Sequence, residues 1–231
     1  QRLGGTGIQT SALAFGGSTP SQTGATNEWD IGVPIGAWAT GGSLNTARTN
    51  FGGVGASGTA ALAFGGAPPG NPAQAVTESY NGTNWTEVND LNDGRYGLAG
   101  AGTNTAALAI AGGEDPGVYK TETETWNGSS WTEVNNLNNA RRYLGGSGTN
   151  TSALAYGGKT PSFSADTEIW NGTNWTEVNN LNTARSNLAS AGSSSTNALA
   201  VGGEPPPSGT GATETWNGTN WTELNDLNTA R

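Results

Sequence analysis

The chain contains one pattern of residues five times in succession, and this internal repeat limits its fold more than any other feature. Each copy has an Ala-Leu-Ala run ending in Gly-Gly, then two aromatic residues that flank a short turn, then an arginine. Trp126-Asn-Gly-Ser-Ser-Trp131 is typical, whereas Trp29 and Trp38 lie farther apart in the first copy. Cutting after each arginine gives the units 1–48, 49–95, 96–141, 142–185 and 186–231.

Each unit predicts four short strands. In order they are a glycine-rich segment such as 3–7, an apolar run such as 12–15, a third strand such as 123–126, and a fourth such as 131–134. The Asn-Gly between the last two favours a tight hairpin in which both residues take positive φ. No segment has sustained helical periodicity. The repeat therefore predicts an all-β, five-bladed β-propeller with four antiparallel strands per blade, forming a single domain over 1–231.

The repeated residues are expected to build this scaffold. Small residues such as Gly52, Gly53, Gly145 and Gly146 would let five sheets converge at the axis. The tryptophan pairs would fill the wider gaps between neighbouring blades, each ring burying about 150–250 Å². These periodic positions are therefore predicted to be packing residues.

Charged residues also recur once per repeat. The arginines that close the units would tie one blade to the next by hydrogen bonds to carbonyls or carboxylates; they are Arg48, Arg95, Arg141, Arg185 and Arg231. Catalytic carboxylates would be expected once rather than in every blade. We therefore interpret both glutamate series as structural partners of Arg or Thr: Glu78, Glu124, Glu168 and Glu214, and Glu87, Glu133, Glu177 and Glu223.

Composition excludes several classes of function. With 9 basic and 18 acidic residues the net charge is −9, which opposes binding to nucleic acid. The chain has no Cys and no His, so it cannot form a disulfide, a Ser-His-Asp triad or the commonest zinc and copper sites. No apolar stretch is long enough to span a bilayer. We expect no cofactor, no metal, no membrane insertion and no enzymatic activity.

The order of these elements resembles the Kelch repeat. The match is carried by Arg95, Gly112-Gly113, Trp126 and Trp131-Thr132-Glu133, with equivalents in the other units, and is weakest over 27–44. The regular Trp-Asn-Gly-Thr-Asn-Trp-Thr-Glu-Val form is also similar to repeats in marine bacteriophage structural proteins. A Kelch relative that oxidises galactose needs His ligands and a Cys-crosslinked Tyr, so the resemblance does not extend to that activity. Kelch adaptors instead bind peptides on one face of the ring.

A binding site is predicted on the face that carries the loops between second and third strands and the connections between blades. These loops, at 18–25, 67–75, 114–120, 159–165 and 204–211, differ most between units, and most contain proline. Tyr119 and Phe163 lie within them, and Tyr96 and Arg142 directly follow closing arginines. The resemblance to Kelch adaptors adds the position two residues after each closing arginine as a ligand contact, which points to Arg2, Asn50, Tyr143 and Asn187.

These observations predict a non-catalytic binding or structural module on a virion or cell surface, with an extracellular location favoured. Its partner would be a protein or a glycan. The alternative is a multivalent carbohydrate-binding lectin with one pocket per blade, although the loops differ between blades. Both ends of the chain coincide with repeat boundaries. This would fit excision from a larger repeat protein or virion assembly, and it would equally fit ends that were selected to match the repeat.

Overall fold

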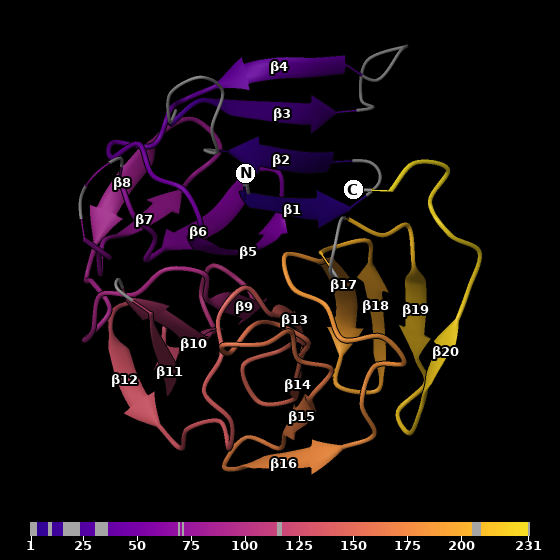
Figure 1. Ribbon diagram of the computed structural model, residues 1–231. Coiled ribbons are helices and arrows are strands. Elements are labelled where there is room, and N and C mark those ends of the chain that lie inside the picture. Colours follow the sequence, from indigo (N-terminus) through magenta and orange to yellow (C-terminus); the bar gives the residue numbers. More distant parts are fainter. Residues whose placement is uncertain are drawn as a thin grey trace.

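The computed structural model describes residues 4–8, 11–15, 24–30, 37–68, 70, 72–114, 117–204 and 209–230. Within these ranges the chain forms twenty β-strands and no helix, so no described helix could cross a membrane. The strands form five sheets of four, which we number as blades 1 to 5 along the chain (Figure 1). The predicted all-β, five-bladed propeller is therefore confirmed.

Every blade is an antiparallel meander built from one continuous segment. Blade 1 has β1 (Gly4–Ile8), β2 (Ser11–Phe15), β3 (Thr26–Asp30) and β4 (Ala37–Gly41). Blade 2 has β5 (Gly52–Ser57), β6 (Ala60–Phe64), β7 (Thr77–Tyr80) and β8 (Trp85–Val88). Blade 3 has β9 (Ala99–Gly102), β10 (Ala107–Glu114), β11 (Val118–Trp126) and β12 (Trp131–Val134).

The last two blades follow the same order. Blade 4 has β13 (Gly145–Gly148), β14 (Ala153–Tyr156), β15 (Thr167–Trp170) and β16 (Trp175–Val178). Blade 5 has β17 (Ala189–Ser194), β18 (Asn197–Val201), β19 (Thr213–Trp216) and β20 (Trp221–Glu223). The first strand of each blade lies toward the centre, where β5, β9 and β13 meet, and the fourth lies at the rim (Figure 1). We call these five inner strands the hub.

Glycine allows the inner strands to approach one another at the hub. A Cβ on Gly100 would lie 2.8 Å from the Val54 side chain and 3.1 Å from the carbonyl of Gly53 in the preceding blade. A Cβ on Gly146 would lie 2.9 Å from the carbonyl of Gly100. Side chains essentially never bring a Cβ within 3.0 Å of backbone, so the predicted role of glycine at the axis is confirmed for Gly146, and Gly100 is as closely packed against Val54.

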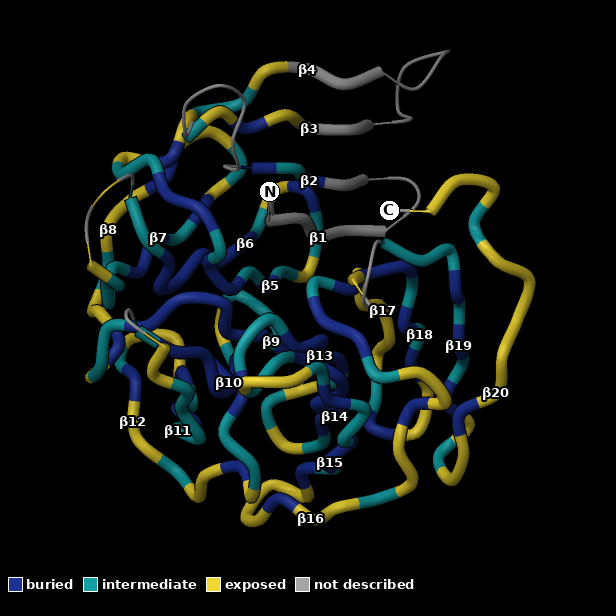
Figure 2. The backbone as a smooth tube through the Cα atoms, viewed as in Figure 1, coloured by how far each residue is buried: buried dark blue, intermediate teal, exposed yellow. Residues whose placement is uncertain are grey.

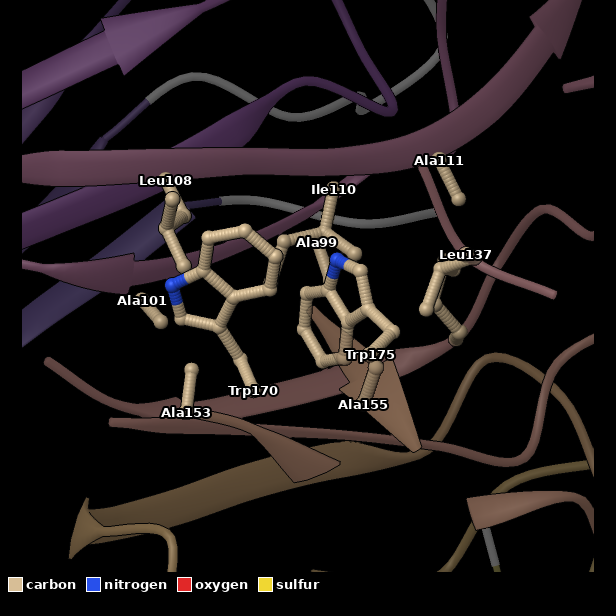
Figure 3. Close-up of a cluster of buried hydrophobic side chains, with 11 residues drawn as sticks. Ala99, Ala101, Leu108, Ile110, Ala111, Leu137, Ala153, Ala155, Trp170 and Trp175 are labelled. Carbon is tan, nitrogen blue, oxygen red and sulfur yellow. The ribbon is translucent and has the colours of Figure 1, made fainter. Parts of the chain in front are cut away.

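In blades 2 to 5 the aromatic pair packs against the blade before it. Trp170 and Trp175 of blade 4 lie among the alanines and Leu108 and Ile110 of blade 3, with Leu137 beside them (Figure 3). Their ring centroids are 5.3 Å apart, and the residues are 2% and 6% exposed. Corresponding clusters join blades 1 and 2, 2 and 3, and 4 and 5. The indoles therefore fill the gaps between blades, as predicted.

The four closing arginines that the structure describes each join one blade to the next by a buried ion pair. Arg141 donates from Nη1 to Oε1 of Glu168 at 2.6 Å and from Nη2 to the carbonyl of Ala155 at 3.4 Å. Asn138 donates its backbone N–H and its side-chain amide to the other carboxylate oxygen, both at 2.8 Å. The same pairing links Arg48 to Glu78, Arg95 to Glu124, and Arg185 to Glu214.

The second glutamate series does not share this role. Glu87, Glu133, Glu177 and Glu223 lie on the rim strands and are exposed. Glu177 accepts a hydrogen bond from the side-chain amide of Asn139, but no described arginine forms an ion pair with these residues. The prediction was wrong for this series because β15 and β16 pair side by side, so that Glu168 and Glu177 are neighbours in different surroundings. The linker from the preceding blade covers only Glu168.

The Asn-Gly turns also differ from the predicted hairpin. Trp170 pairs with Trp175, which leaves a four-residue loop, and within it Gly172 alone has positive φ, at 93°. Asn171 uses its side-chain oxygen to accept the backbone N–H groups of Thr173 and Asn174, both at 2.9 Å. This side-chain cap takes the place of a left-handed asparagine in shaping the turn.

Candidate functional site

The blade-to-blade connections and the loops between second and third strands share one face, as predicted. Short antiparallel bridges tie them together, with Thr49 opposite Ala67, Tyr96 opposite Gly113, Arg142 opposite Lys159, and Ser186 opposite Glu204. We call this the loop-rich face. The turns between first and second strands and between third and fourth strands lie on the opposite face.

A chain of backbone hydrogen bonds surrounds the hub on the loop-rich face. The position two residues after each closing arginine, which we call the slot, lies two residues before the start of the inner strand in blades 2 to 5. The Gly97 N–H donates to the carbonyl of Asn50 at 2.6 Å, Tyr143 to Gly97 at 2.6 Å, and Asn187 to Tyr143 at 2.9 Å. The slots of four consecutive blades are therefore joined directly, and the predicted residues Asn50, Tyr143 and Asn187 come together there. Arg2 lies outside the described residues.

All four slot residues have left-handed backbone conformations. Asn50, Gly97 and Asn187 have φ of 56°, 67° and 54°, which Gly and Asn adopt most readily. Tyr143 has φ of 60°, a conformation that costs a residue of this kind about 1–3 kcal/mol and is found most often at functional sites. Gly97 leaves room for it, because a Cβ there would be 3.0 Å from the tyrosine ring.

Arg142 lies among three tyrosine rings beside this slot. Its guanidinium carbon is 5.0 Å from the ring centroid of Tyr96 and 5.2 Å from those of Tyr119 and Tyr143. Its Nη1 also donates to the hydroxyl of Tyr96. Tyr96 is 5% exposed, whereas the other three side chains are half-buried. We call these four residues the tyrosine–arginine cluster; it combines flat apolar rings with a cation, which suits ligands with a ring face and a hydrogen-bond acceptor.

Tyr119 reaches the cluster from a strand rather than from a loop. The prediction treated 114–120 as a loop, but β10 continues to Glu114 and β11 begins at Val118. A register shift at Ala111, which has φ of 55°, interrupts the hairpin between Ile110 and Gly112. Beyond this bulge Tyr119 pairs with Gly113, next to the bridge from Gly113 to Tyr96. The extended hairpin therefore holds Tyr119 more rigidly than a loop would.

Phe163 lies in the corresponding loop of blade 4. It bridges to Lys159, whose ammonium is 5.2 Å from the phenyl centroid, and Lys159 is paired through its backbone with Arg142. Phe163 thus contacts the cluster through Lys159 rather than directly. Asn187 donates from its side chain to Glu204 at 3.0 Å, so this predicted residue already has a partner within its own blade.

An acidic cavity lies beside the cluster between blades 2 and 3. Its volume is about 240 Å³, and its lining comprises Pro72, Ala73, Asp93, Gly94 and Glu114. Lys120 forms ion pairs with both carboxylates. Partial burial of Lys120 acts to lower its pKa, but hydrogen bonds and charges from Asp93 and Glu114 outweigh it and raise the pKa above the ordinary value of 10.5.

Sequence reasoning placed Pro72, Ala73, Glu114, Lys120 and Lys159 in the variable loops of the predicted binding face but singled out none of them. Lys120 and Lys159 are the only lysines of the chain, and both fall in the variable loops, so their rarity was an available signal. The pairing of Asp93 with Lys120 joins residues 27 positions apart and carries no local signal. Within the described ranges no three acidic residues gather closely enough to hold a metal ion.

Comparison with known proteins identifies the fold and no family. No family model matches the sequence, and no curated protein matches it. Among solved structures, the chain is similar to YjhT with a TM-score of 0.80 and 12% sequence identity, over 98% of this chain and 84% of that one. At this level of identity the likeness establishes a β-propeller and carries no information on activity.

Proposed function

We propose that this protein is a non-catalytic binding module that recognises an acidic segment of a partner protein through its loop-rich face. The observation that carries this proposal is the tyrosine–arginine cluster beside the strained Tyr143 at the hub. Every described slot has a left-handed backbone, so blade packing accounts for this conformation but not for a tyrosine there, because the other slots hold Asn or Gly. The lack of Cys and His supports binding rather than catalysis.

The distribution of cations supports an acidic ligand. Four of the nine basic residues are buried in junction ion pairs, and two, Arg2 and Arg231, lie outside the described residues. The other three, Lys120, Arg142 and Lys159, all lie on the loop-rich face of blades 3 and 4. Asp93 and Glu114 offset the charge of Lys120, so Arg142 and Lys159 are the cations that would attract a carboxylate-bearing ligand toward the cluster in a chain of net charge −9.

The biological setting is proposed from sequence resemblance. The repeats resemble Kelch adaptors, which bind peptides on one face of the ring, and are similar to repeats of marine bacteriophage structural proteins. Both resemblances favour a recognition role on a virion or cell surface, within a larger repeat protein or virion assembly. An extracellular location follows from the same proposal.

A lectin is the second candidate, because the aromatic rings and hydrogen-bonding groups of the tyrosine–arginine cluster would also suit a sugar. A lectin with one pocket per blade would need the same side chains in each blade. The slots instead hold Asn50, Gly97, Tyr143 and Asn187, and the three-tyrosine cluster is formed once among the described residues. The geometry therefore favours a single site over five equivalent ones.

The proposal can be tested by screening the chain against a peptide library and a glycan array, each with acidic and neutral members. We expect acidic peptides to bind, and Arg142→Ala and Tyr143→Gly each to weaken that binding at least tenfold, about 1.4 kcal/mol. Thr173→Ala, in an exposed turn on the opposite face, is the matched control and should bind normally. Equal binding by all three variants would place the site elsewhere and refute the proposal.

A further inference from the structure

Each of the four described junctions uses one indole hydrogen bond of the same kind. The second tryptophan of a blade donates from Nε1 to the hydroxyl of a threonine in the third strand of the preceding blade, three residues before the first aromatic of that blade. Trp131 donates to Thr77 at 3.1 Å and Trp175 to Thr123 at 3.2 Å. The other two pairs are Trp85 with Thr26 and Trp221 with Thr167. All four threonines are completely buried.

The linker that leaves a blade completes the junction. Leu181 enters the core shared with the next blade, Asn182 donates twice to Glu214, and Arg185 forms its ion pair with the same carboxylate. Each blade therefore offers its successor a threonine, an apolar face and a Leu-Asn-x-x-Arg linker. The successor supplies a tryptophan pair, and a glutamate two residues before the first aromatic.

Blade 5 offers the same groups, but the described residues leave them uncovered. Thr213 donates to the carbonyl of Gly211 at 3.3 Å, as Thr77 does to Ala75, which leaves its oxygen able to accept an indole. Within the described part of the chain no indole donates to it, and the residue is partly exposed. Leu227 is also partly exposed, and Leu224 is 45% exposed. The sequence from Leu227 repeats that of 181–185, although its last residue, Arg231, lies outside the described range.

The inner strand of blade 5 differs from the other inner strands in the same way. In β9 and β13 buried and half-buried residues alternate, whereas β17 is exposed from Ala189 to Ser193 (Figure 2). Leu199 on β18 is half-buried, whereas Leu62, Leu108 and Leu154 at the same position are completely buried. These positions of blade 5 are therefore less covered than the same positions of blades 2 to 4.

Blade 1 does not supply the required complement. Asn27 pairs with Ala14 just as Glu78 pairs with Ala63, so an asparagine occupies the position of the junction glutamate. Asn27 is exposed, whereas the four junction glutamates are at most 1% exposed. An amide carries no charge to offset a buried guanidinium, and a buried cation without an anionic partner is costly. Trp29 and Trp38 are also separated by eight residues instead of four.

We infer that the open side of blade 5, together with the described linker residues 227–230, is a docking surface for one further blade of the same repeat class. That blade carries a Thr-Glu-x-Trp-Asn-Gly third strand and comes from a segment outside residues 1–231. Its indole binds Thr213, and its apolar face covers Leu224, Leu227 and β17. The four existing junctions show directly which groups fit this surface.

The test appends a second copy of residues 186–231 after Arg231. Hydrogen exchange followed by mass spectrometry should then show segment 189–201 exchanging about tenfold more slowly, approaching segment 99–110 of blade 3. The matched control carries Glu214→Gln and Trp221→Ala in the added copy only, and should leave segment 189–201 as it is in the original chain. Unchanged exchange in the chain with the intact added copy would overturn the inference.

A second variant tests whether blade 1 is the true partner of blade 5. Asn27→Glu in the original chain restores the junction glutamate within blade 1. Under our inference this variant leaves exchange in 189–201 unchanged, because blade 1 does not cover that surface. Slower exchange of segment 189–201 in this single variant would show that blade 1 covers blade 5 and would refute the inference. The inference would also be refuted if the original chain dimerised in sedimentation and its segment 189–201 exchanged more slowly as the protein concentration rose.

Discussion

The buried pair between Arg141 and Glu168 permits a sharp test of how the blades are held together. We consider Glu168→Gln, which keeps the side-chain volume and removes the charge. Both side chains of the pair are 0% exposed, so solvent cannot compensate Arg141 after the change. The carboxylate also accepts two hydrogen bonds from Asn138, and the amide can replace only part of this network.

Removing one partner of such a buried pair costs about 3–5 kcal/mol, because the remaining charge stays buried without its counter-charge. For a chain of this size each 1 kcal/mol lowers the melting temperature by about 2–4 °C. We therefore expect Glu168→Gln to melt roughly 10 °C below the unaltered chain.

The assay is thermal and urea unfolding, compared with Glu177→Gln. Glu177 is directly opposite Glu168 in the strand register but is exposed, so the same chemical change there should cost less than about 0.5 kcal/mol. Replacing both Arg141 and Glu168 by Met should recover most of the loss, because no unpaired charge remains. If Glu168→Gln and Glu177→Gln unfolded alike, the proposed role of the buried pair would be refuted.

Three further predictions concern packing, strain and pH. Trp175→Ala should cost about 3–5 kcal/mol in urea unfolding, because the ring is 6% exposed and joins two blades; a loss below 1 kcal/mol would contradict its packing role. Tyr143→Gly should change the free energy of unfolding by less than about 1 kcal/mol, since relief of the left-handed strain offsets the lost ring contacts. A much larger loss of stability would show that Tyr143 has a structural role instead. The pKa of Lys120 is higher in the folded chain than in the unfolded chain, where it is about 10.5. The protonated Lys120 therefore stabilises the folded chain fully at pH values below 10.5. This stabilisation is lost as the pH rises through the higher pKa of the folded chain. The stability difference between the unaltered chain and Lys120→Met should therefore shrink between pH 9 and pH 12, and a difference that grew with pH would contradict this assignment.

The scaffold was predictable because its signals recur. Trp170, Trp175, Arg141 and Gly146 are each one member of a series, so a single physical reason had to explain the whole series. The two glutamate series were not separable by the same reasoning. Glu168 follows Thr167 and Glu177 follows Thr176, so their local sequences are alike, and only the linker from the preceding blade buries one of them.

The candidate site was predictable in part. The slot position was found from its variation between repeats, but its left-handed conformation was not, because Tyr143 is a residue type that rarely adopts it. Tyr119 was placed in a loop because proline and glycine interrupt 114–120, yet the bulge at Ala111 allows the hairpin to continue past the usual end of the strand. Contacts such as Lys120 with Asp93 depend on how two blades meet, which no local pattern encodes.

Calorimetric titration with the strongest ligand from the peptide and glycan screens tests the proposed function most directly, because it counts sites. A single site at the tyrosine–arginine cluster predicts one ligand per chain for the unaltered protein and loss of the heat signal in Arg142→Ala. A stoichiometry near five sugars per chain, unchanged in Arg142→Ala, would instead establish equivalent pockets on every blade and contradict the proposal.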